Sequence, residues 1–243
     1  MRILCMLPAA KGVYPQEAEE RRLNVMRSYS NMATQVDADY MPQVSGFSPW
    51  GGAGGSAGPD PDAGARAGEF SAQRAVQAEK EGYNAFCPFG TLDVGVRLAR
   101  ERVKIPVVGQ AEACFLYCGM LDRPFASVSY TAGGEDRIAA WAKEAGVGHL
   151  LKANTNVGIP NSEYPQRRGE LLQAFVRCAG EARAARAEML GLVAMSICPT
   201  EYSAKELSDA SRMPVLDALA AQIAMAEWWH RTGLPASLLR MPR

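Results

Sequence analysis

Short apolar runs alternate along the chain with longer stretches in which apolar residues recur every three or four positions. A short apolar run bounded by turn residues is typical of a buried strand, and the longer spacing is typical of an amphipathic helix. The predicted strands are 3–7, 38–44, a run ending at Cys87, 105–109, 125–130, 150–153, 190–197 and 214–216. The predicted helices are 17–33, 70–81, 93–102, 110–120, 135–145, 168–188, 202–210 and 219–231. This alternation predicts an α/β fold with parallel sheets and helices on both faces.

One sequence pattern occurs twice. An apolar run leads into a Cys-Pro step and then a Thr in residues 84–91 and again in residues 195–201. In each case a second proline follows inside another short apolar run, at Pro106 and at Pro214. The repeat indicates that the chain contains two related halves, each with one cysteine at the end of a strand.

The two halves predict two pseudo-symmetric, Rossmann-like α/β lobes. Residues 1–120 are expected to form the first lobe, with the C-terminal helix 217–243 packing back on it, and residues 121–216 the second. Ligands bind at the carboxyl ends of strands in open parallel sheets, so we expect the active site in the cleft between the lobes. The Gly- and Pro-rich segment 46–68 has no period and is predicted to be a loop, in which Trp50 favours a lid.

Composition narrows the classes of partner. The 243 residues include 26 basic and 26 acidic side chains, so the formal net charge is zero. Nucleic acids and anionic membrane surfaces attract proteins with a positive field, so neither is expected as a partner. No run approaches the roughly 20 apolar residues of a membrane span, and residues 1–8 are too short for a signal sequence. We therefore expect a cytoplasmic protein that binds a small molecule.

The chain has six cysteines, which in a reducing compartment are structural, catalytic or metal-binding rather than paired. Cys114 and Cys118 share a helix face, but a zinc site needs about four ligands and the chain has only two histidines. No metal is therefore expected. Core packing is predicted for Cys5, Cys114, Cys118 and Cys178. Cys87 and Cys198 differ because each lies in the repeated pattern.

The repeated pattern suggests acid–base chemistry by Cys87 and Cys198. A strand-to-helix turn places a thiol near a helix N-terminus, whose partial positive charge stabilises a thiolate. Thr91 and Thr200 are expected to cap those helices, and nearby backbone amides to stabilise enolate charge. Two thiols on opposite walls of a cleft could remove a proton from a carbon and return one to its other face. The expected substrate contacts are Pro88, Thr91, Ser129, Tyr130, Thr131, Pro199 and Thr200.

Two other kinds of site lack support. The Gly-rich run 51–55 has no Lys-Ser/Thr pair and does not join a strand to a helix, as a phosphate loop would. Neither His149 nor His230 lies near a motif that would indicate a Ser-His-Asp triad. No nucleotide-binding site is expected.

With both Cys-Pro turns in place, the chain resembles the aspartate/glutamate racemase superfamily, and within it the hydantoin/allantoin racemase branch. The resemblance is firmest over residues 82–120 and 191–229, which hold the Cys87 region and the run from Cys198 to Pro214-Val215-Leu216-Asp217. It implies a cofactor-independent enzyme whose two cysteines act as acid and base on opposite faces of a carbon next to a carbonyl.

The chain departs from that branch in three places. Leu7-Pro8-Ala9-Ala10-Lys11 stands where an Asn-Pro-Asn type of loop is usual. Cys198 is followed by Pro-Thr-Glu rather than by small residues, and segment 46–68 has no recognised counterpart.

The resemblance implies a racemase or epimerase acting on a carbon acid such as a 5-substituted hydantoin or related ureide. We also expect a homo-oligomer. Two alternatives come from the same superfamily, an arylmalonate-type decarboxylase that uses one thiol and a maleate-type cis–trans isomerase. A third alternative is a two-lobed small-ligand binder without catalytic activity.

Overall fold

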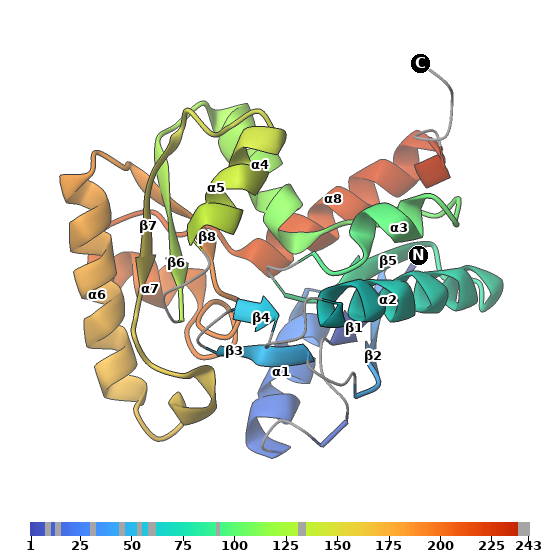
Figure 1. Ribbon diagram of the computed structural model, residues 1–243, viewed down its shortest axis with the longest axis horizontal. Coiled ribbons are helices and arrows are strands. Elements are labelled where there is room, and N and C mark those ends of the chain that lie inside the picture. The colour runs from blue at the N-terminus through green and yellow to red at the C-terminus, as the bar shows by residue number, and fades with distance from the viewer. Residues whose placement is uncertain are drawn as a thin grey trace. The chain divides into compact units, whose positions relative to one another are not determined.

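The computed structural model describes residues 1–7, 11–12, 16–29, 33–43, 47–52, 55–57, 62–90, 93–130 and 135–237. Its strands are β1 (Arg2–Leu7), β2 (Gln35–Tyr40), β3 (Phe47–Gly52), β4 (Gly55–Ala57), β5 (Ala85–Pro88), β6 (Phe125–Ser129), β7 (Leu151–Asn156) and β8 (Met189–Val193) (Figure 1). Its α-helices are α1 (Gln16–Ser28), α2 (Ala63–Lys80), α3 (Val96–Arg100), α4 (Gln110–Leu121), α5 (Glu135–Glu144), α6 (Arg168–Ala184), α7 (Ala204–Ser211) and α8 (Ala218–Thr232). A short 3₁₀ helix covers Asn161–Glu163.

The chain divides into two compact units. The first comprises residues 1–49, 57–110 and 222–243, and the second comprises residues 50–56 and 111–221. The first unit holds the sheet β2-β1-β5, and the second holds the sheet β7-β6-β8. All strand pairs in these two sheets are parallel, so the predicted α/β class is confirmed.

Both sheets are built in the same order and extended in the same way. A parallel bridge joins Phe86 of β5 to Val107, and another joins Leu190 of β8 to Val215. The amide of Phe86 donates to the Pro106 carbonyl at 2.9 Å, and the amide of Leu190 donates to the Pro214 carbonyl at 2.8 Å. The apolar runs after the two Cys-Pro steps therefore each add a short segment beside the third strand, which agrees with the predicted repeat.

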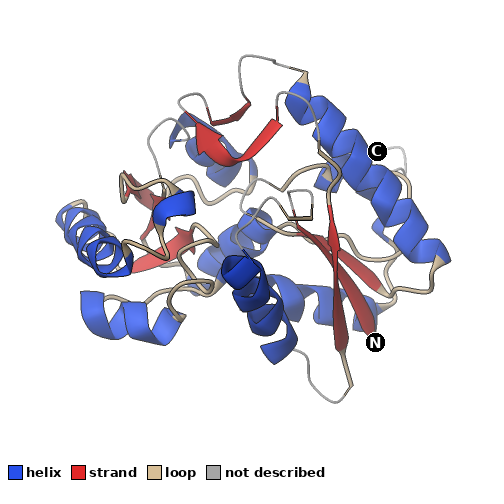
Figure 2. Ribbon diagram, turned by 90° about the horizontal axis from the view of Figure 1, so that it is seen from below, coloured by secondary structure: helices blue, strands red, loops and turns tan. Residues whose placement is uncertain are grey.

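The sheet of the second unit is covered on both faces. Phe175 of α6 packs with Val128 of β6 in one buried cluster, and Cys114 and Cys118 of α4 pack with Phe125 in another. Figure 1 shows α6 and α5 on opposite sides of this sheet, and Figure 2 shows the helices and strands of the molecule from below. Successive residues of a strand point to opposite faces, so Phe125 and Val128 lie in different clusters.

In the first unit, Leu4 and Phe86 face the helices α2 and α3 and form a buried cluster with them. Their neighbours along the strands, Cys5 and Cys87, point to the opposite face and are also completely buried. This alternation explains why β1 and β5 read as continuous apolar runs, because strands covered on both faces need apolar residues at every position.

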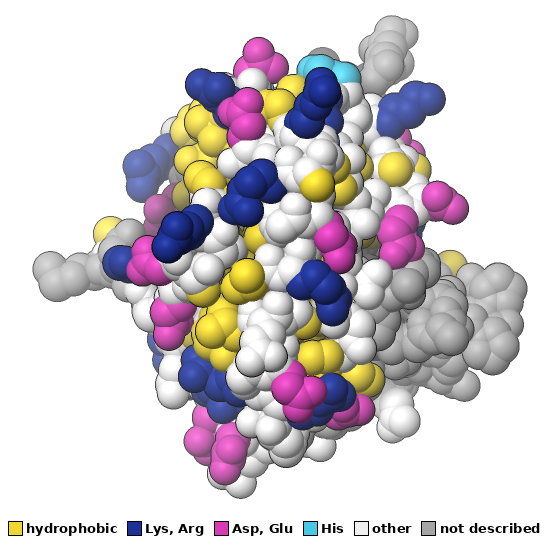
Figure 3. Space-filling model, turned by 90° about the vertical axis from the view of Figure 1, so that its left-hand side faces the viewer, with side chains coloured by type: hydrophobic (Ala, Val, Ile, Leu, Met, Phe, Trp, Pro, Cys, Tyr) yellow, Lys and Arg dark blue, Asp and Glu magenta, His cyan; other side chains and the backbone are white. Residues whose placement is uncertain are grey.

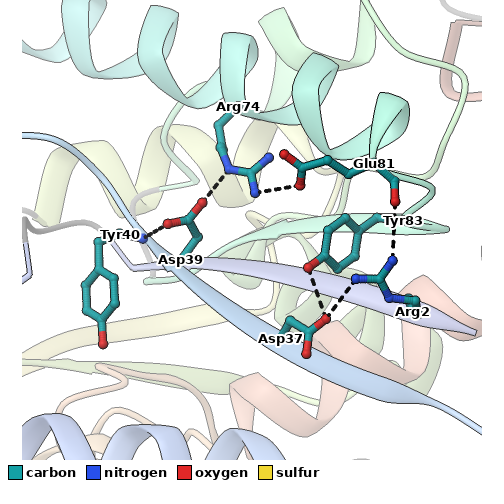
Figure 4. A network of polar contacts seen from close by, with 7 residues as sticks. All are labelled: Arg2, Asp37, Asp39, Tyr40, Arg74, Glu81 and Tyr83. Atoms are coloured by element: carbon teal, nitrogen blue, oxygen red, sulfur yellow. Dashed lines mark hydrogen bonds and ion pairs between the residues drawn. The ribbon is translucent and has the colours of Figure 1, made fainter.

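A polar network attaches the edge strand β2 to its surroundings (Figure 4). Arg2 and the Tyr83 hydroxyl both donate to Asp37, at 3.3 Å and 3.0 Å. Arg74 of α2 pairs with Asp39. These contacts join β2, at the edge of the sheet order β2-β1-β5, to β1 and to α2 through charged groups.

The interpretation of segment 46–68 as a loop is wrong. β3 and β4 form a two-stranded sheet within it, and α2 begins at Ala63 rather than at residue 70. Glycine supplies no apolar side chain to mark an alternation, so Gly-rich strands escape detection by periodicity.

Charges of both signs are interspersed over the face of the molecule that Figure 3 shows. This distribution agrees with the formal net charge of zero. Within the described ranges, no helix combines the length and the apolar character that crossing a membrane requires.

Candidate active site

Cys87 is the third residue of β5 and is completely buried. Its partner in the parallel register of β1 is Cys5, which is also completely buried. A hydrogen bond between the two thiols, together with burial, raises the pKa of Cys87 well above its ordinary value. The Cys87 thiol is therefore protonated at neutral pH, in contrast to the thiolate expected from the sequence.

Two buried glutamines hold the turn that follows Cys87. Gln222 of α8 donates its Nε2 hydrogens to the carbonyls of Pro88 and Val108, both at 2.8 Å. Gln110, the first residue of α4, accepts a hydrogen bond from the amide of Gly90 at 3.1 Å. These contacts fix the carboxyl end of β5. The sequence offered no signal for either residue, because a single polar residue on a helix is normally exposed.

Cys198 lies beyond the end of β8, in the turns that lead to α7. Its amide donates to the Ala194 carbonyl at 3.0 Å, its peptide bond to Pro199 is cis, and its side chain is completely buried. Burial raises the pKa of Cys198 well above the ordinary value, and the negative charge of Asp217 raises it further. This thiol is also protonated at neutral pH.

Buried hydroxyl groups gather beside the Cys198 turn. Tyr164 is buried, which raises the pKa of its hydroxyl, and the nearby Ser196 hydroxyl partly opposes this increase. Among the described residues, neither hydroxyl has a partner at good hydrogen-bond geometry. Tyr130, which follows β6, lies close enough to affect Tyr164. Tyr130 was expected in the site from its place at a strand end, whereas Tyr164 and Ser196 were missed.

The two Cys-Pro steps do not occupy equivalent positions in their sheets. Phe86 and Leu190 make the same bridge and the same hydrogen bonds, so these two residues are equivalent. Cys87 directly follows Phe86, but the residue that follows Leu190 is Gly191, and Cys198 comes only after β8 has ended. The expected matching placement of the two thiols is therefore wrong, because similar spacing in sequence does not fix the register.

The expected caps are also wrong where the structure describes them. The N-cap of α7 is Ser203, which forms a capping box with Glu206, and not Thr200. The amide of Thr200 donates to Met195 at 3.3 Å, so it is not directed at a ligand. The N-cap of α3 is Gly95, and Thr91 lies outside the described residues. A Ser followed by Glu three residues later is a stronger helix start than a Thr further upstream.

The other predicted site residues lie as follows. Ser129 is the last residue of β6 and donates to the Thr155 carbonyl at 3.3 Å. Pro88 ends β5, and Pro199 follows Cys198 in its turn. Thr131 lies outside the described residues. In the part of the chain that the structure describes, no three or more His, Cys, Asp or Glu side chains converge as they would around a metal ion.

Comparison with known proteins identifies relatives of this chain. The family model for Asp/Glu/Hydantoin racemase matches residues 23–226. A hydantoin racemase of Rhizobium meliloti is 27% identical over 155 residues, which cover 62% of this chain and 62% of that protein. The match thus spans less than two thirds of the relative.

Two solved structures have the same fold. Allantoin racemase from Pseudomonas fluorescens matches with a TM-score of 0.79 and 20% identity, covering 100% of this chain and 97% of the other. Allantoin racemase from Klebsiella pneumoniae matches with a TM-score of 0.75 and 17% identity, covering 98% and 90%. Since the family model covers most of the residues, the chain belongs to the Asp/Glu/Hydantoin racemase family.

Proposed function

We propose that the protein is a cofactor-independent racemase of a carbon acid, of the 5-substituted hydantoin or related cyclic ureide class. One observation supports this assignment most strongly within the family. Each of the two parallel sheets has one buried cysteine, Cys87 or Cys198, in or just beyond the carboxyl end of its third strand. The names of the relatives, hydantoin racemase and allantoin racemase, support the substrate class.

In the proposed mechanism, one thiolate removes the proton from the carbon next to the carbonyl. The electron pair moves onto the carbonyl oxygen as an enolate, and the other thiol then gives its proton to the opposite face of the carbon. The product is the mirror-image substrate, and the two sulfurs have exchanged their protonation states. Neither sulfur needs a further reactant.

The surroundings of both candidate thiols oppose the thiolate form. At Cys87, the hydrogen bond with the Cys5 thiol, together with burial, raises the pKa and therefore favours the neutral thiol. Near Cys198, the negative charge of Asp217 opposes a thiolate. Either thiol can act as the base once it is ionised, and the enantiomer that is bound determines which of the two removes the proton.

Incubation of single hydantoin and allantoin enantiomers in D₂O tests the proposed function. We expect loss of optical rotation together with uptake of deuterium at the inverted carbon. Release of CO₂ from an arylmalonate, or conversion of maleate, would instead indicate the alternative activities of the family. If no ureide in a broad panel racemises or takes up deuterium, the assignment is refuted.

We also propose that the chain self-associates and works in a reducing, cytoplasmic compartment. None of its six cysteines is in a disulfide. α4 has four apolar side chains that are 37% to 72% exposed, Leu116, Tyr117, Met120 and Leu121. A second copy of the chain would cover them. Light scattering after gel filtration should show an oligomer that Met120→Lys weakens, and a monomeric native protein would contradict self-association.

A further inference from the structure

The two glutamines beside the Cys87 turn have amides whose orientation is set by their partners. Gln222 donates to two carbonyls, those of Pro88 and Val108, so the nitrogen faces them. Gln110 accepts from the amide of Gly90, so the oxygen faces that group. Turning either amide over would place acceptor against acceptor or donor against donor. The remaining atoms are therefore a donor, Gln110 Nε2, and an acceptor, Gln222 Oε1.

These two remaining atoms are buried without partners among the residues that the structure describes. Both glutamines are 0% exposed, and Gln110 Nε2 and Gln222 Oε1 make no hydrogen bond to any described residue. Buried amide atoms nearly always have a partner, so each such exception calls for an explanation. A donor and an acceptor left over in the same place indicate a ligand that offers one of each.

Both amides contact the carboxyl end of β5 just after Cys87. Gln222 binds Pro88, the residue after Cys87, and Gln110 binds Gly90 two residues further on. Gln222 also binds Val108, two residues before Gln110. All of these residues belong to the first unit. The leftover donor and acceptor thus border the same turn as the Cys87 thiol.

We propose that Gln110 and Gln222 bind a neutral –CO–NH– edge of the substrate, Gln110 donating to its carbonyl oxygen and Gln222 accepting from its N–H. This inference rests on the proposed function, because it concerns recognition at the same site. It also selects a substrate class. A carboxylate has no N–H for the Gln222 carbonyl and would place negative charge against it, so ureides are favoured over arylmalonates and maleate.

Binding of 5,5-dimethylhydantoin tests this recognition apart from catalysis. That compound has the ureide edge but no hydrogen on the carbon that a racemase would invert. By calorimetry, we expect it to bind at least about tenfold more tightly than its fully N-methylated derivative, and more tightly than phenylmalonate. Equal binding of the methylated compound, tighter binding of phenylmalonate, or no binding of the hydantoin would overturn the inference.

Two variants of Gln110 separate recognition from support of the turn. Gln110→Glu keeps an oxygen for the Gly90 amide, and Gln110→Met removes both groups. If Gln110 only supports the turn, the Glu variant binds like the native protein at every pH. If it donates to the ligand, Gln110→Met binds about tenfold more weakly. The Glu variant then loses affinity relative to the native protein between about pH 5 and pH 8, as its carboxyl group ionises and stops donating.

Thermal melting confirms that each variant is folded before binding is compared. A folded Gln110→Met protein with native affinity would overturn the inference. Failure of the proposed function has a different result. If 5,5-dimethylhydantoin binds in the expected pattern but no ureide racemises, recognition stands and the racemase assignment falls. If ureides racemise but N-methylation and the Met substitution have no effect, the racemase stands and the recognition falls.

Discussion

At the scale of single residues, the two candidate thiols differ in their neighbours. Cys87 shares a hydrogen bond with another thiol, Cys5, whereas Cys198 lies near the carboxylate of Asp217. The sequence identified Cys87 and Cys198 through their repeated Cys-Pro context. The sequence did not identify Cys5 as a neighbour of Cys87, because Cys5 is distant in sequence and lies beside Cys87 only through the pairing of β1 with β5.

Replacing Asp217 with Asn should make Cys198 more reactive. The Asp217 carboxylate accepts hydrogen bonds from the amides of Leu219 and Ala220, both at 3.0 Å, and an Asn oxygen can keep these contacts at the start of α8. Loss of the negative charge lowers the pKa of Cys198, so alkylation by iodoacetamide at fixed pH should speed up roughly threefold to tenfold. Peptide mass spectrometry measures the rate, with buried Cys118 as the internal control. An unchanged or slower Cys198 rate would refute the charge effect.

Activity should rise with pH above neutrality. The mechanism needs one thiolate, and both Cys87 and Cys198 have a raised pKa, so the fraction of reactive enzyme increases as the pH rises. The logarithm of kcat/KM for ureide racemisation should increase with a slope of about one per pH unit on the alkaline side of neutrality. A rate that is flat or falls over that range would show that neither thiol ionises as proposed.

At the scale of elements, the sequence predicted the strands and helices whose apolar period is strong. β1, β6, α4 and α5 all lie within a few residues of their expected places. β3 and β4 were missed because their glycines do not contribute to an alternation of apolar and polar residues. Cys87 and Cys198 were wrongly expected at equivalent positions because spacing in sequence does not determine strand register. The buried glutamines were missed for a related reason, since burial of a polar residue depends on a neighbour that the local sequence does not show.

The contact between β8 and α4 depends on the absence of a side chain at Gly191. A Cβ there would lie 2.4 Å from Cys118 Sγ and 2.9 Å from Phe125 Cδ2. Gly191→Ala should therefore lower the free energy of unfolding by about 1–3 kcal/mol through overpacking. Gly180→Ala is the matched control, because nothing lies within 4 Å of a Cβ at that helical position.

Urea unfolding measures both glycine variants. Gly180→Ala should raise stability by about 0.5–1 kcal/mol, as expected for Gly-to-Ala in a helix. Adding Cys118→Ala to Gly191→Ala should cost less than the sum of the single changes, because it removes the clashing sulfur. A Gly191→Ala protein as stable as the native one would contradict this close packing.

At the scale of the whole molecule, the two units repeat one sheet order and both contain buried thiols. Cys87 lies in the first unit, and Cys118, Cys178 and Cys198 lie in the second. Each of these four has a pKa raised by its surroundings above the reference of 9.0. The pattern of apolar runs predicts two α/β halves. It does not predict that these thiols stay neutral, because that follows from their burial in the folded protein.

The protein should lose stability in alkaline solution. A thiol with a raised pKa in the folded state holds its proton more tightly when the protein is folded. Its contribution to the free energy of unfolding is therefore complete below pH 9.0 and declines above it. For Cys118 the decline continues to about 12, the pKa to which burial raises its thiol. In that range, each such thiol lowers the free energy of unfolding by about 1.4 kcal/mol per pH unit. Urea unfolding should show this decline, less steeply in Cys118→Ala, and an equal slope in that variant would contradict it.

Racemisation by single-cysteine variants tests the two-thiol mechanism most directly. One ureide enantiomer is incubated in D₂O with the native protein, Cys87→Ser or Cys198→Ser, and both optical rotation and deuterium uptake are followed. Because each thiol handles the proton on one face of the carbon, either substitution should abolish racemisation while folding, checked by circular dichroism, is retained. Deuterium uptake with retention of configuration in one variant would agree with a single remaining base. A folded Cys87→Ser or Cys198→Ser protein that racemises at the native rate would contradict the mechanism.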